Sequence, residues 1–328
     1  MMRWLLLFVF LCAALNCSED KAPSGPPGDA DFAVYFLKDT SMTTQEAMEH
    51  GLEDVELENE PWLSSEDIDF YDFSTHCIYL KTDKGDFFEN FREHSFYFTP
   101  PLTDRPFVVA GGGERCYMGS LHSAALSMAP RGPFVDESDV GYYPTDVIHI
   151  SRVPMVEQDL RDSECVEKAL ADLDLLRDGP SVMLDAVRIV ENADTSTVQY
   201  TFTITNHDRD DLYVPDPDVM GNGLFHFYTN GVVFVNETTH LESKYKIVVA
   251  PDPYYYWETS WFARLETDET LQRTVTLKGY PRIPSGTYSC TFVYSGPVKI
   301  EREERLLADG RIWIGEIVSG AIEVIVAE

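Results

Sequence analysis

Apolar and polar residues alternate along most of the second half of the chain. The clearest segments are VMLDAVRIV at 182–190, VQYTFTITN at 198–206, RTVTLKGY at 273–280, GTYSCTFVYSG at 286–296 and AIEVIVAE at 321–328. Three more segments are rich in β-branched and aromatic residues: GLFHFYTNGVVFV at 223–235, YKIVVA at 245–250 and YYYWETSWFARL at 254–265. Turn-forming residues separate many of these segments, so residues 181–328 are predicted to form an all-β sandwich.

Residues 32–153 show a mixed pattern. Strand-like runs occur at FAVYFL (32–37), at CIYLK (77–81), on both sides of a glycine turn in RPFVVAGGGERCYMGSL (105–121), and at YPTDVIHI (143–150). Between them, TTQEAMEH predicts a short helix capped by Ser41 or Thr43, and SSED at 64–67 predicts another. Strands interleaved with short helices predict an α+β N-terminal domain.

One longer helix is predicted within residues 154–180. Its apolar residues repeat at helical spacing: Val166, Ala169, Leu170, Leu173 and Leu176. Gly179 and Pro180 end the pattern. Because this segment lies between the mixed region and the β region, we expect it to join the two domains.

The N-terminus has the pattern of a secretory signal. Arg3 precedes the apolar run WLLLFVFLCAAL, which is too short to span a bilayer, and no later run has ~18 apolar residues. The following ALNC and SEDKAPSGPPGDAD resemble a bacterial lipoprotein signal and its tether. The resemblance implies lipidation at Cys17, a signal over 1–17, a flexible tether over 18–31 and an extracytoplasmic, lipid-anchored location. An ordinary signal cleaved near Ala14 is the alternative.

The chain is strongly acidic. It has 328 residues, a formal net charge of −31 and a pI of about 4.4, so it would be repelled by nucleic acids. No Lys or Arg lies between Lys38 and Lys81, a stretch that holds twelve Asp or Glu residues. Four residues of this stretch could form a hard-cation site: Asp67, Asp69, Asp72 and His76. A solvated acidic face is the preferred interpretation.

Six cysteines occur in the sequence. Cys12 would be lost with the signal, and Cys17 would carry the lipid. The other four, Cys77, Cys116, Cys165 and Cys290, allow three pairings, and the sequence leaves the choice open. None of them forms a CxxC pair, so a zinc ribbon is not supported.

Two segments of the β region resemble immunoglobulin-like domains. IPSGTYSCTFVY at 283–294 resembles the start of the penultimate strand, with Tyr288 two residues before Cys290, the spacing of a tyrosine corner. Because 198–206 contains no cysteine, Cys290 is predicted to be a buried thiol. QYTFTITNHDRDDLYV at 199–214 resembles bacterial Ig-like, proteinase-inhibitor-like accessory domains. In the first region, PWLSSEDI and FVVAGGGERCYMGS resemble small α+β head subdomains of secretion-accessory proteins.

Residues 254–262, YYYWETSWF, are the most aromatic stretch. As a strand, the run would place Trp257 and Trp261 on one face, which we expect to be buried. The opposite face would carry Tyr254, Tyr256 and Glu258, either as cross-strand packing or as a contact surface for a sugar or a protein.

Aspartates cluster in DRDDLYVPDPD at 208–218. The five are Asp208, Asp210, Asp211, Asp216 and Asp218. Loops of this kind bind calcium weakly in extracellular β domains, although the same residues also favour turns. Calcium is therefore a possible ligand, and no other cofactor is predicted.

No catalytic motif is present, since the sequence contains neither G-x-S-x-G nor H-E-x-x-H. We therefore predict a secreted, lipid-anchored envelope protein that binds or scaffolds a protein or a glycan without catalysis. The alternative is a hydrolase of an envelope polymer with a cleft between the two domains.

Overall fold

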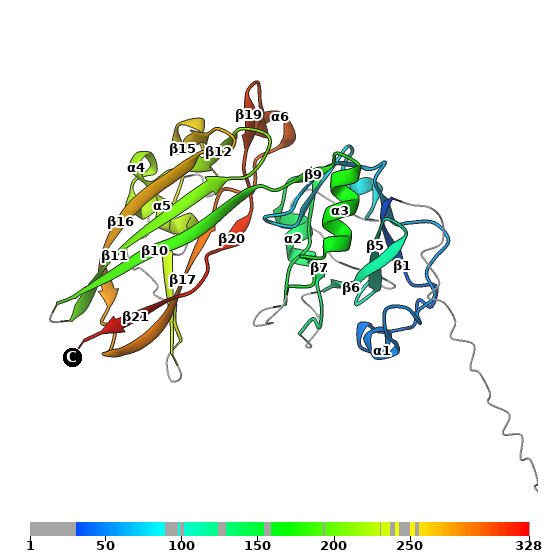
Figure 1. Cartoon of the computed structure of the whole chain (residues 1–328), viewed down its shortest axis with the longest axis horizontal. Helices are drawn as coiled ribbons and strands as arrows, with labels where there is room; N and C mark the ends of the chain where they lie inside the picture. Colours follow the sequence, from blue (N-terminus) through cyan, green and yellow to red (C-terminus); the bar gives the residue numbers. More distant parts are fainter. Residues whose placement is uncertain are drawn as a thin grey trace, which may run out of the picture.

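The computed structural model describes residues 31–88, 98, 102–123, 129–153, 159–192, 194–229, 231–236, 240–242, 250–252 and 256–327. The predicted signal and almost all of the tether, including Cys17, lie outside these residues. The described chain is mostly β, with strands in five sheets (Figure 1). None of the helices in this part of the chain is both long and apolar enough to cross a bilayer.

The first sheet has the order β2-β1-β5-β6-β7. Its strands are β1 (Phe32–Phe36), β2 (Leu63–Ser64), β5 (Pro106–Gly111), β6 (Glu114–His122) and β7 (Phe134–Asp136). Gly112 and Gly113 join β5 to β6 with φ angles of 57° and 82°, so the predicted glycine turn is confirmed. The predicted helix α1 (Thr44–His50) is also confirmed, and Thr43 and Glu46 form its capping box.

The second sheet has the order β8-β4-β3-β9 and lies between the first sheet and the sandwich. Its strands are β3 (Ile68–Asp72), β4 (Cys77–Leu80), β8 (Val147–His149) and β9 (Leu176–Arg177). The helix predicted at SSED is wrong. Ser64 donates from its backbone N–H and its hydroxyl to Asp67 Oδ2, which closes a turn between β2 and β3 instead.

Helix α3 (Glu164–Asp172) is shorter than the predicted 154–180, of which residues 154–158 are not described. It buries Val166, Ala169 and Leu170 in the core of the first sheet, and the disulfide Cys116–Cys165 ties it to β6. The helix thus lies on the first sheet, and β9 and Gly179 carry the chain to β10. We refer below to the N-terminal half (residues 31–178) and the C-terminal half (residues 180–327).

Two sheets of the C-terminal half pack face to face. One has the order β10-β11-β16, from β10 (Pro180–Glu191), β11 (Thr195–Asn206) and β16 (Thr270–Pro281). The other contains β13 (Gly231–Val235), β14 (His240–Glu242), β17 (Gly286–Ser295), β20 (Glu316–Val318) and β21 (Ile322–Val326). The rings of Phe202 and Phe292 lie 4.8 Å apart between the sheets. The Tyr288 hydroxyl donates to the Pro284 carbonyl at 2.9 Å, the hydrogen bond that characterises a tyrosine corner. Cys290 is a buried free thiol, as predicted.

Part of the predicted strand at 223–235 is wrong. Residues Asn222–Thr229 form helix α5, after the short helix α4 (Pro217–Met220), and the strand begins at Gly231. Aromatic content favoured a strand, but Phe225 and Thr229 are one helical turn apart and both are buried. Of the predicted strand YKIVVA, all residues but Ala250 lie outside the described part of the chain.

A further sheet, β15-β12-β19-β18, lies at one end of the sandwich. It consists of β12 (Leu212–Pro215), β15 (Phe262–Leu265), β18 (Leu306–Leu307) and β19 (Gly310–Ile312). Helix α6 (Arg302–Arg305) precedes β18, and α6 and β19 lie where the two halves meet (Figure 1). The remaining elements are α2 (Glu137–Tyr142), η1 (Lys84–Asp86) and η2 (Thr259–Trp261).

Arginines of the C-terminal half pair with aspartates of the N-terminal half. Arg302 contacts Asp69 at 2.8 Å, and Arg305 contacts Asp146 at 2.7 Å. Arg311 donates to Asp72 at 2.7 Å and to Asp208 at 2.6 Å, and all three side chains are buried. Asp69 and Asp72 belong to the acidic stretch between Lys38 and Lys81, which therefore contributes to the contact between the halves.

Candidate functional site between the two halves

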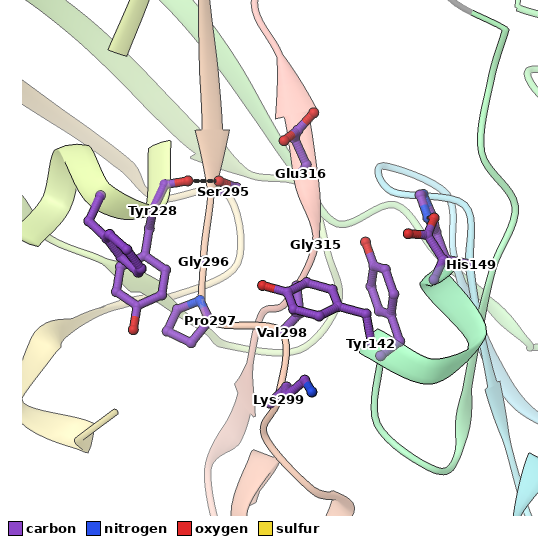
Figure 2. A pocket seen from close by; sticks show the side chains of 13 residues that line it. Tyr142, His149, Tyr228, Ser295, Gly296, Pro297, Val298, Lys299, Gly315 and Glu316 are labelled. Carbon is purple, nitrogen blue, oxygen red and sulfur yellow. Dashed lines mark hydrogen bonds and ion pairs between the residues drawn. The ribbon is translucent and has the colours of Figure 1, made fainter. Parts of the chain in front are cut away.

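A cavity of about 530 Å³ opens between the two halves of the chain (Figure 2). The N-terminal half contributes Asp139, Tyr142, Tyr143 and His149 to its lining, from α2, β8 and their connection. The C-terminal half contributes Phe227 and Tyr228 of α5, Ser295 at the end of β17 with residues 296–299 after it, and Glu316 at the start of β20 with Gly315 before it. Figure 2 shows Tyr142 and His149 on one side and Tyr228 with Ser295 and Pro297 on the other.

The C-terminal wall is built from connections at one end of the sandwich. The Ser295 hydroxyl donates to the Tyr228 carbonyl, which fixes the end of β17 to α5. Gly315 has a φ of 120°, and a Cβ at this position would meet Thr75 Cγ2 at 2.7 Å. A glycine is therefore needed where the C-terminal half passes closest to Thr75 of the N-terminal half.

The N-terminal wall is held by a buried lysine. Lys84 Nζ donates to the carbonyls of Val140 at 2.7 Å and Tyr143 at 3.0 Å, around the C-terminal end of α2. Burial lowers the pKa of Lys84 to about 7, against the opposing effect of Asp146. This anchor fixes the end of the helix that presents Tyr142, whose side chain is 45% exposed at the cavity.

Two carboxyl groups of the cavity have pKa values shifted in opposite directions. Burial opposes ionisation of Asp139, but hydrogen bonds from His149 Nδ1 at 2.8 Å and the Ser151 hydroxyl at 2.9 Å outweigh it and lower its pKa. The surrounding protein displaces water from the Glu316 carboxyl and raises its pKa, although His149 opposes this. Glu316 thus keeps its proton to a higher pH than an ordinary glutamate, whereas Asp139 is ionised down to a lower pH than an ordinary aspartate.

The Asp139, His149 and Ser151 side chains do not form a catalytic triad. Ser151 Oγ lies 3.2 Å from His149 Nδ1, the same ring nitrogen that contacts Asp139. In a triad the serine and the carboxylate contact different nitrogens of the imidazole. The arrangement instead orients the His149 ring, which also packs against Tyr143 with ring centroids 4.9 Å apart.

A second cavity of about 890 Å³ adjoins the first, and His149 and Glu316 line both. Its lining includes Ser74, Ser151 and Arg152 of the N-terminal half and Ser181, Val182 and His207 of the C-terminal half. At its wall, buried His76 contacts Asp162 at 3.2 Å and the Tyr71 hydroxyl at 3.1 Å. Burial lowers the pKa of His76, although the contact with Asp162 opposes the shift.

In the described part of the aromatic run, residues 256–261 do not form the predicted strand, which begins only at Phe262 with β15. Thr259–Trp261 form the 3₁₀ turn η2, and Trp257 is half-buried while Trp261 is buried, so the two tryptophans do not share a strand face. Tyr256 is 44% exposed. Glu258 accepts a hydrogen bond from the Trp261 indole N–H at 2.6 Å, which competes with its predicted role in ligand binding. Tyr254 lies outside the described residues.

The run nevertheless adjoins the first cavity. The Tyr228 hydroxyl donates to the Tyr256 carbonyl at 3.1 Å, and the Trp261 ring lies 6.3 Å from the ring of Tyr228. Tyr228 lines the cavity, so the aromatic run supports the wall from behind. Tyr256 and Glu258 themselves are not among its lining residues.

The five aspartates at 208–218 are each paired with an arginine. Their partners are Arg311 for Asp208, Arg177 for Asp210, Arg264 for Asp211, and Arg273 for both Asp216 and Asp218. Asp216 also caps α4. Within the described residues, no three His, Cys, Asp or Glu side chains are grouped to hold a metal ion. Calcium binding stays a prediction, and a calcium ion would have to compete with these guanidinium groups.

The sequence pattern did not single out the residues of the two cavities. Asp139, Tyr142, His149 and Glu316 belong to no motif, and Glu316 lies more than 160 residues after the others in the sequence. The adjacent tyrosines 142 and 143 before Pro144 are the one local signal. Comparison with protein-family models and with curated proteins found no match, so the functional argument rests on the geometry of the cavities.

Proposed function

We propose that the protein binds a glycan of the cell envelope in the cavity between its two halves, without catalysis. The observation that carries the proposal is the combination of tyrosine rings with carboxyl and imidazole groups in one open cavity. Tyr142 and Tyr228 offer aromatic rings for the C–H face of a sugar ring, although Lys299 Nζ lies 5.3 Å from the Tyr142 ring centroid and a bound sugar would share that ring with it. Asp139, His149 and Glu316 offer partners for hydroxyl groups.

A protein partner at the envelope is the alternative ligand. A stable protein interface buries about 800 Å² on each partner and is built around closely packed anchors. A concave site with a few polar groups suits a small molecule or a short polymer segment better. The cavity therefore favours the glycan.

We infer an α+β N-terminal domain and an Ig-like C-terminal sandwich, with the boundary near Gly179. The sheet orders β10-β11-β16 and β14-β13-β17-β21 support this, because they correspond to strands A-B-E and C′-C-F-G of Ig-like domains. In Ig-like domains, binding loops cluster at one end of the sandwich. The segments that contribute to the cavity, α5 and the chain after β17, occupy the equivalent connections.

Binding can be tested on a glycan panel with the full chain. Tyr142→Ala is expected to weaken binding of the selected glycan about tenfold, ~1.4 kcal/mol, because the stacking ring is removed. Tyr142→Phe should keep most of the affinity, since the ring and not the hydroxyl makes the contact. As a matched control, Ile325→Ala truncates another exposed apolar side chain that lines neither cavity. Equal affinity of the Tyr142→Ala variant and the wild type would reject the site.

We also propose that Cys17 is lipidated and that residues 18–31 tether the protein to the envelope, with a reach of roughly 20 Å. Cys17→Ala should then move the protein from the membrane fraction to the soluble fraction, because the buried acyl methylenes contribute ~0.8 kcal/mol each. A wild-type protein that is already soluble after secretion would contradict the lipid anchor but not the glycan site.

Hydrolysis of an envelope polymer is the second candidate function, favoured by the opposite pKa shifts of Asp139 and Glu316. Glu316 would protonate the glycosidic oxygen as the C–O bond breaks, and Asp139 would accept a proton from the attacking water. Mass spectrometry of the bound oligosaccharide decides between the functions. Shortened products that disappear in Glu316→Gln, with binding retained, would establish hydrolysis. An intact ligand after long incubation with the wild type would leave binding alone.

A further inference from the structure

We infer that the two adjoining cavities form one groove that binds a linear, uncharged or cationic oligosaccharide across several sugar units. The inference rests on the proposed glycan-binding function and specifies its ligand. The observation behind it is that His149 and Glu316 line both cavities. The two spaces are therefore neighbours on the same seam between the halves of the chain.

The size of the groove requires an extended ligand. The first cavity has a volume of about 530 Å³ and the second about 890 Å³. Each by itself falls within the ~300–1,000 Å³ typical of a small-molecule site. A single sugar ring would occupy only part of one cavity, so a chain of several rings is needed to fill both.

The second cavity offers the groups that a hydroxyl-rich polymer needs. Ser181 Oγ lies 2.8 Å from His207 Nε2, and both side chains are exposed at the edge of the cavity. On the other half of the chain, the hydroxyls of Ser74 and Ser151 donate to Asp72 and Asp139, so they can offer their lone pairs as acceptors. The exposed Arg152 contributes donors. Hydroxyl, imidazole and guanidinium groups on both walls match a ligand with donors and acceptors along both edges.

The charge of the chain restricts the kind of polymer. A net charge of −31 repels polyanions at long range, and Glu316 lies at the junction of the two cavities, although Lys299, Arg152 and Arg161 also line them. Glycans rich in uronate, sulfate or phosphate are therefore disfavoured. Neutral sugars and amino sugars meet no such long-range repulsion, and a protonated amino group would be attracted to the carboxylates of Asp162 and Asp178, which line the second cavity.

The test measures affinity against chain length by calorimetry. The probes are β-1,4-linked glucose, N-acetylglucosamine and glucosamine oligomers of two to six units, with oligogalacturonate as the polyanionic comparison. In at least one of the first three series, the hexasaccharide should bind at least about tenfold tighter than the disaccharide, which corresponds to ~1.4 kcal/mol. Oligogalacturonate should bind more weakly at every length.

Two variants locate the extra affinity in the second cavity. Ser181→Trp places a large side chain at its edge, and Arg152→Ala removes donors with little risk to folding because Arg152 is exposed. In both variants, the affinity for the hexasaccharide should fall towards the affinity of the wild-type protein for the disaccharide. For Arg152→Ala the affinity for the hexasaccharide should fall by at least about threefold. The control Thr287→Trp carries the same bulk on an exposed position of β17 that lines neither cavity, and should retain the wild-type length dependence.

The outcomes separate this inference from the proposed function. If the disaccharide binds, if its binding is lost in Tyr142→Ala, and if affinity does not rise with oligosaccharide length, the glycan site stands and the extended groove is overturned. Tighter binding of oligogalacturonate would overturn the stated ligand class. Absence of binding in all series and on the wider glycan panel would remove the proposed function itself.

Discussion

The two halves of the chain are both β-rich, but they are stabilised in different ways. In the described N-terminal half, no strand is longer than the 9 residues of β6, and the disulfide Cys116–Cys165 ties α3 to the first sheet. In the C-terminal half, β10, β11 and β16 have 12 residues each, and inward-facing aromatic side chains fill the sandwich. Long regular strands bury a continuous core, whereas short strands gain from a covalent cross-link.

The contact between the halves combines apolar burial with buried charge. Phe70, Cys77 and Tyr79 of the second sheet join the hydrophobic core of the C-terminal half. Beside them, the Arg311 guanidinium lies 5.1 Å from the Phe70 ring centroid while it bonds Asp72 and Asp208. Neither half can satisfy these groups alone, because Arg311 would be left without Asp72. The contact is therefore expected to favour one defined arrangement of the two halves, and with it the groove.

Removal of this arginine is expected to have the largest effect. Arg311→Ala leaves the buried Asp72 without its cation and Asp208 with only Arg177 at 3.9 Å, which should lower the free energy of unfolding by about 3–5 kcal/mol. Arg264→Ala, which breaks an exposed pair with Asp211, should cost no more than ~1 kcal/mol. Urea unfolding of both variants provides the measurement. Similar losses for the two arginines would mean that the buried contact does not couple the halves.

The disulfide is expected to matter next. It closes a loop with a sequence separation of 49, and the double variant Cys116→Ser, Cys165→Ser should lose about 2–4 kcal/mol. A reductant should destabilise the wild type by a similar amount and leave the double variant unchanged, since Cys77 and Cys290 are free thiols. If the reductant has no effect on the wild type, the N-terminal half does not depend on this link.

A pH effect is expected from the C-terminal half. Burial lowers the pKa of His226 in α5 to about 4, while the unfolded value is about 6.5. Below the unfolded pKa the unfolded chain binds more protons than the folded one, so stability is complete above about pH 6.5 and is lost as the pH falls towards 4. Between pH 7 and pH 5 this histidine should remove about 2 kcal/mol.

The variant His226→Leu isolates this contribution. Its unfolding free energy should fall about 2 kcal/mol less than that of the wild type over the same pH range. His50→Gln changes an exposed histidine of α1 and should keep the wild-type slope. Parallel curves for His226→Leu and the wild type would exclude His226 as the source of the acid sensitivity.

The comparison of the halves also explains which elements the sequence predicted. The strict alternation of apolar and polar residues in β11 is a local signal, and so are the glycines before β6. The strand and the turn both formed where the sequence predicted them. The SSED segment forms a turn because Ser64 bonds Asp67. Residues Asn222–Thr229 form α5, with Phe225 buried. The local pattern of apolar and polar residues encodes neither the bond nor the burial. Short elements with few residues per period carry too little pattern to decide between helix, turn and strand.

The candidate site was less predictable than the fold. The acidic stretch before Lys81 looked solvated because its partners Arg302 and Arg311 lie more than 200 residues later in the sequence. His149 and Glu316 meet for the same reason, through the packing of the two halves and not through any motif. The aromatic run lies next to the cavity, since the Tyr256 carbonyl accepts a hydrogen bond from Tyr228. The residues predicted from this run, however, support the wall of the cavity and do not line it.

The smallest expected effect concerns Tyr288, which the sequence identified correctly. Its ring is buried and its hydroxyl donates to the Pro284 carbonyl four residues earlier, at the start of β17. Tyr288→Phe keeps the ring and removes the hydroxyl, which bonds the Pro284 carbonyl and also the Asn236 side chain, so the free energy of unfolding should fall by about 1 kcal/mol. Thr287→Val, at the exposed neighbouring position, should change stability by less than about 0.5 kcal/mol. If Tyr288→Phe leaves the free energy of unfolding unchanged, packing of the ring alone stabilises this corner. The long strands of the C-terminal half would then hold their register without the hydrogen bonds of the hydroxyl.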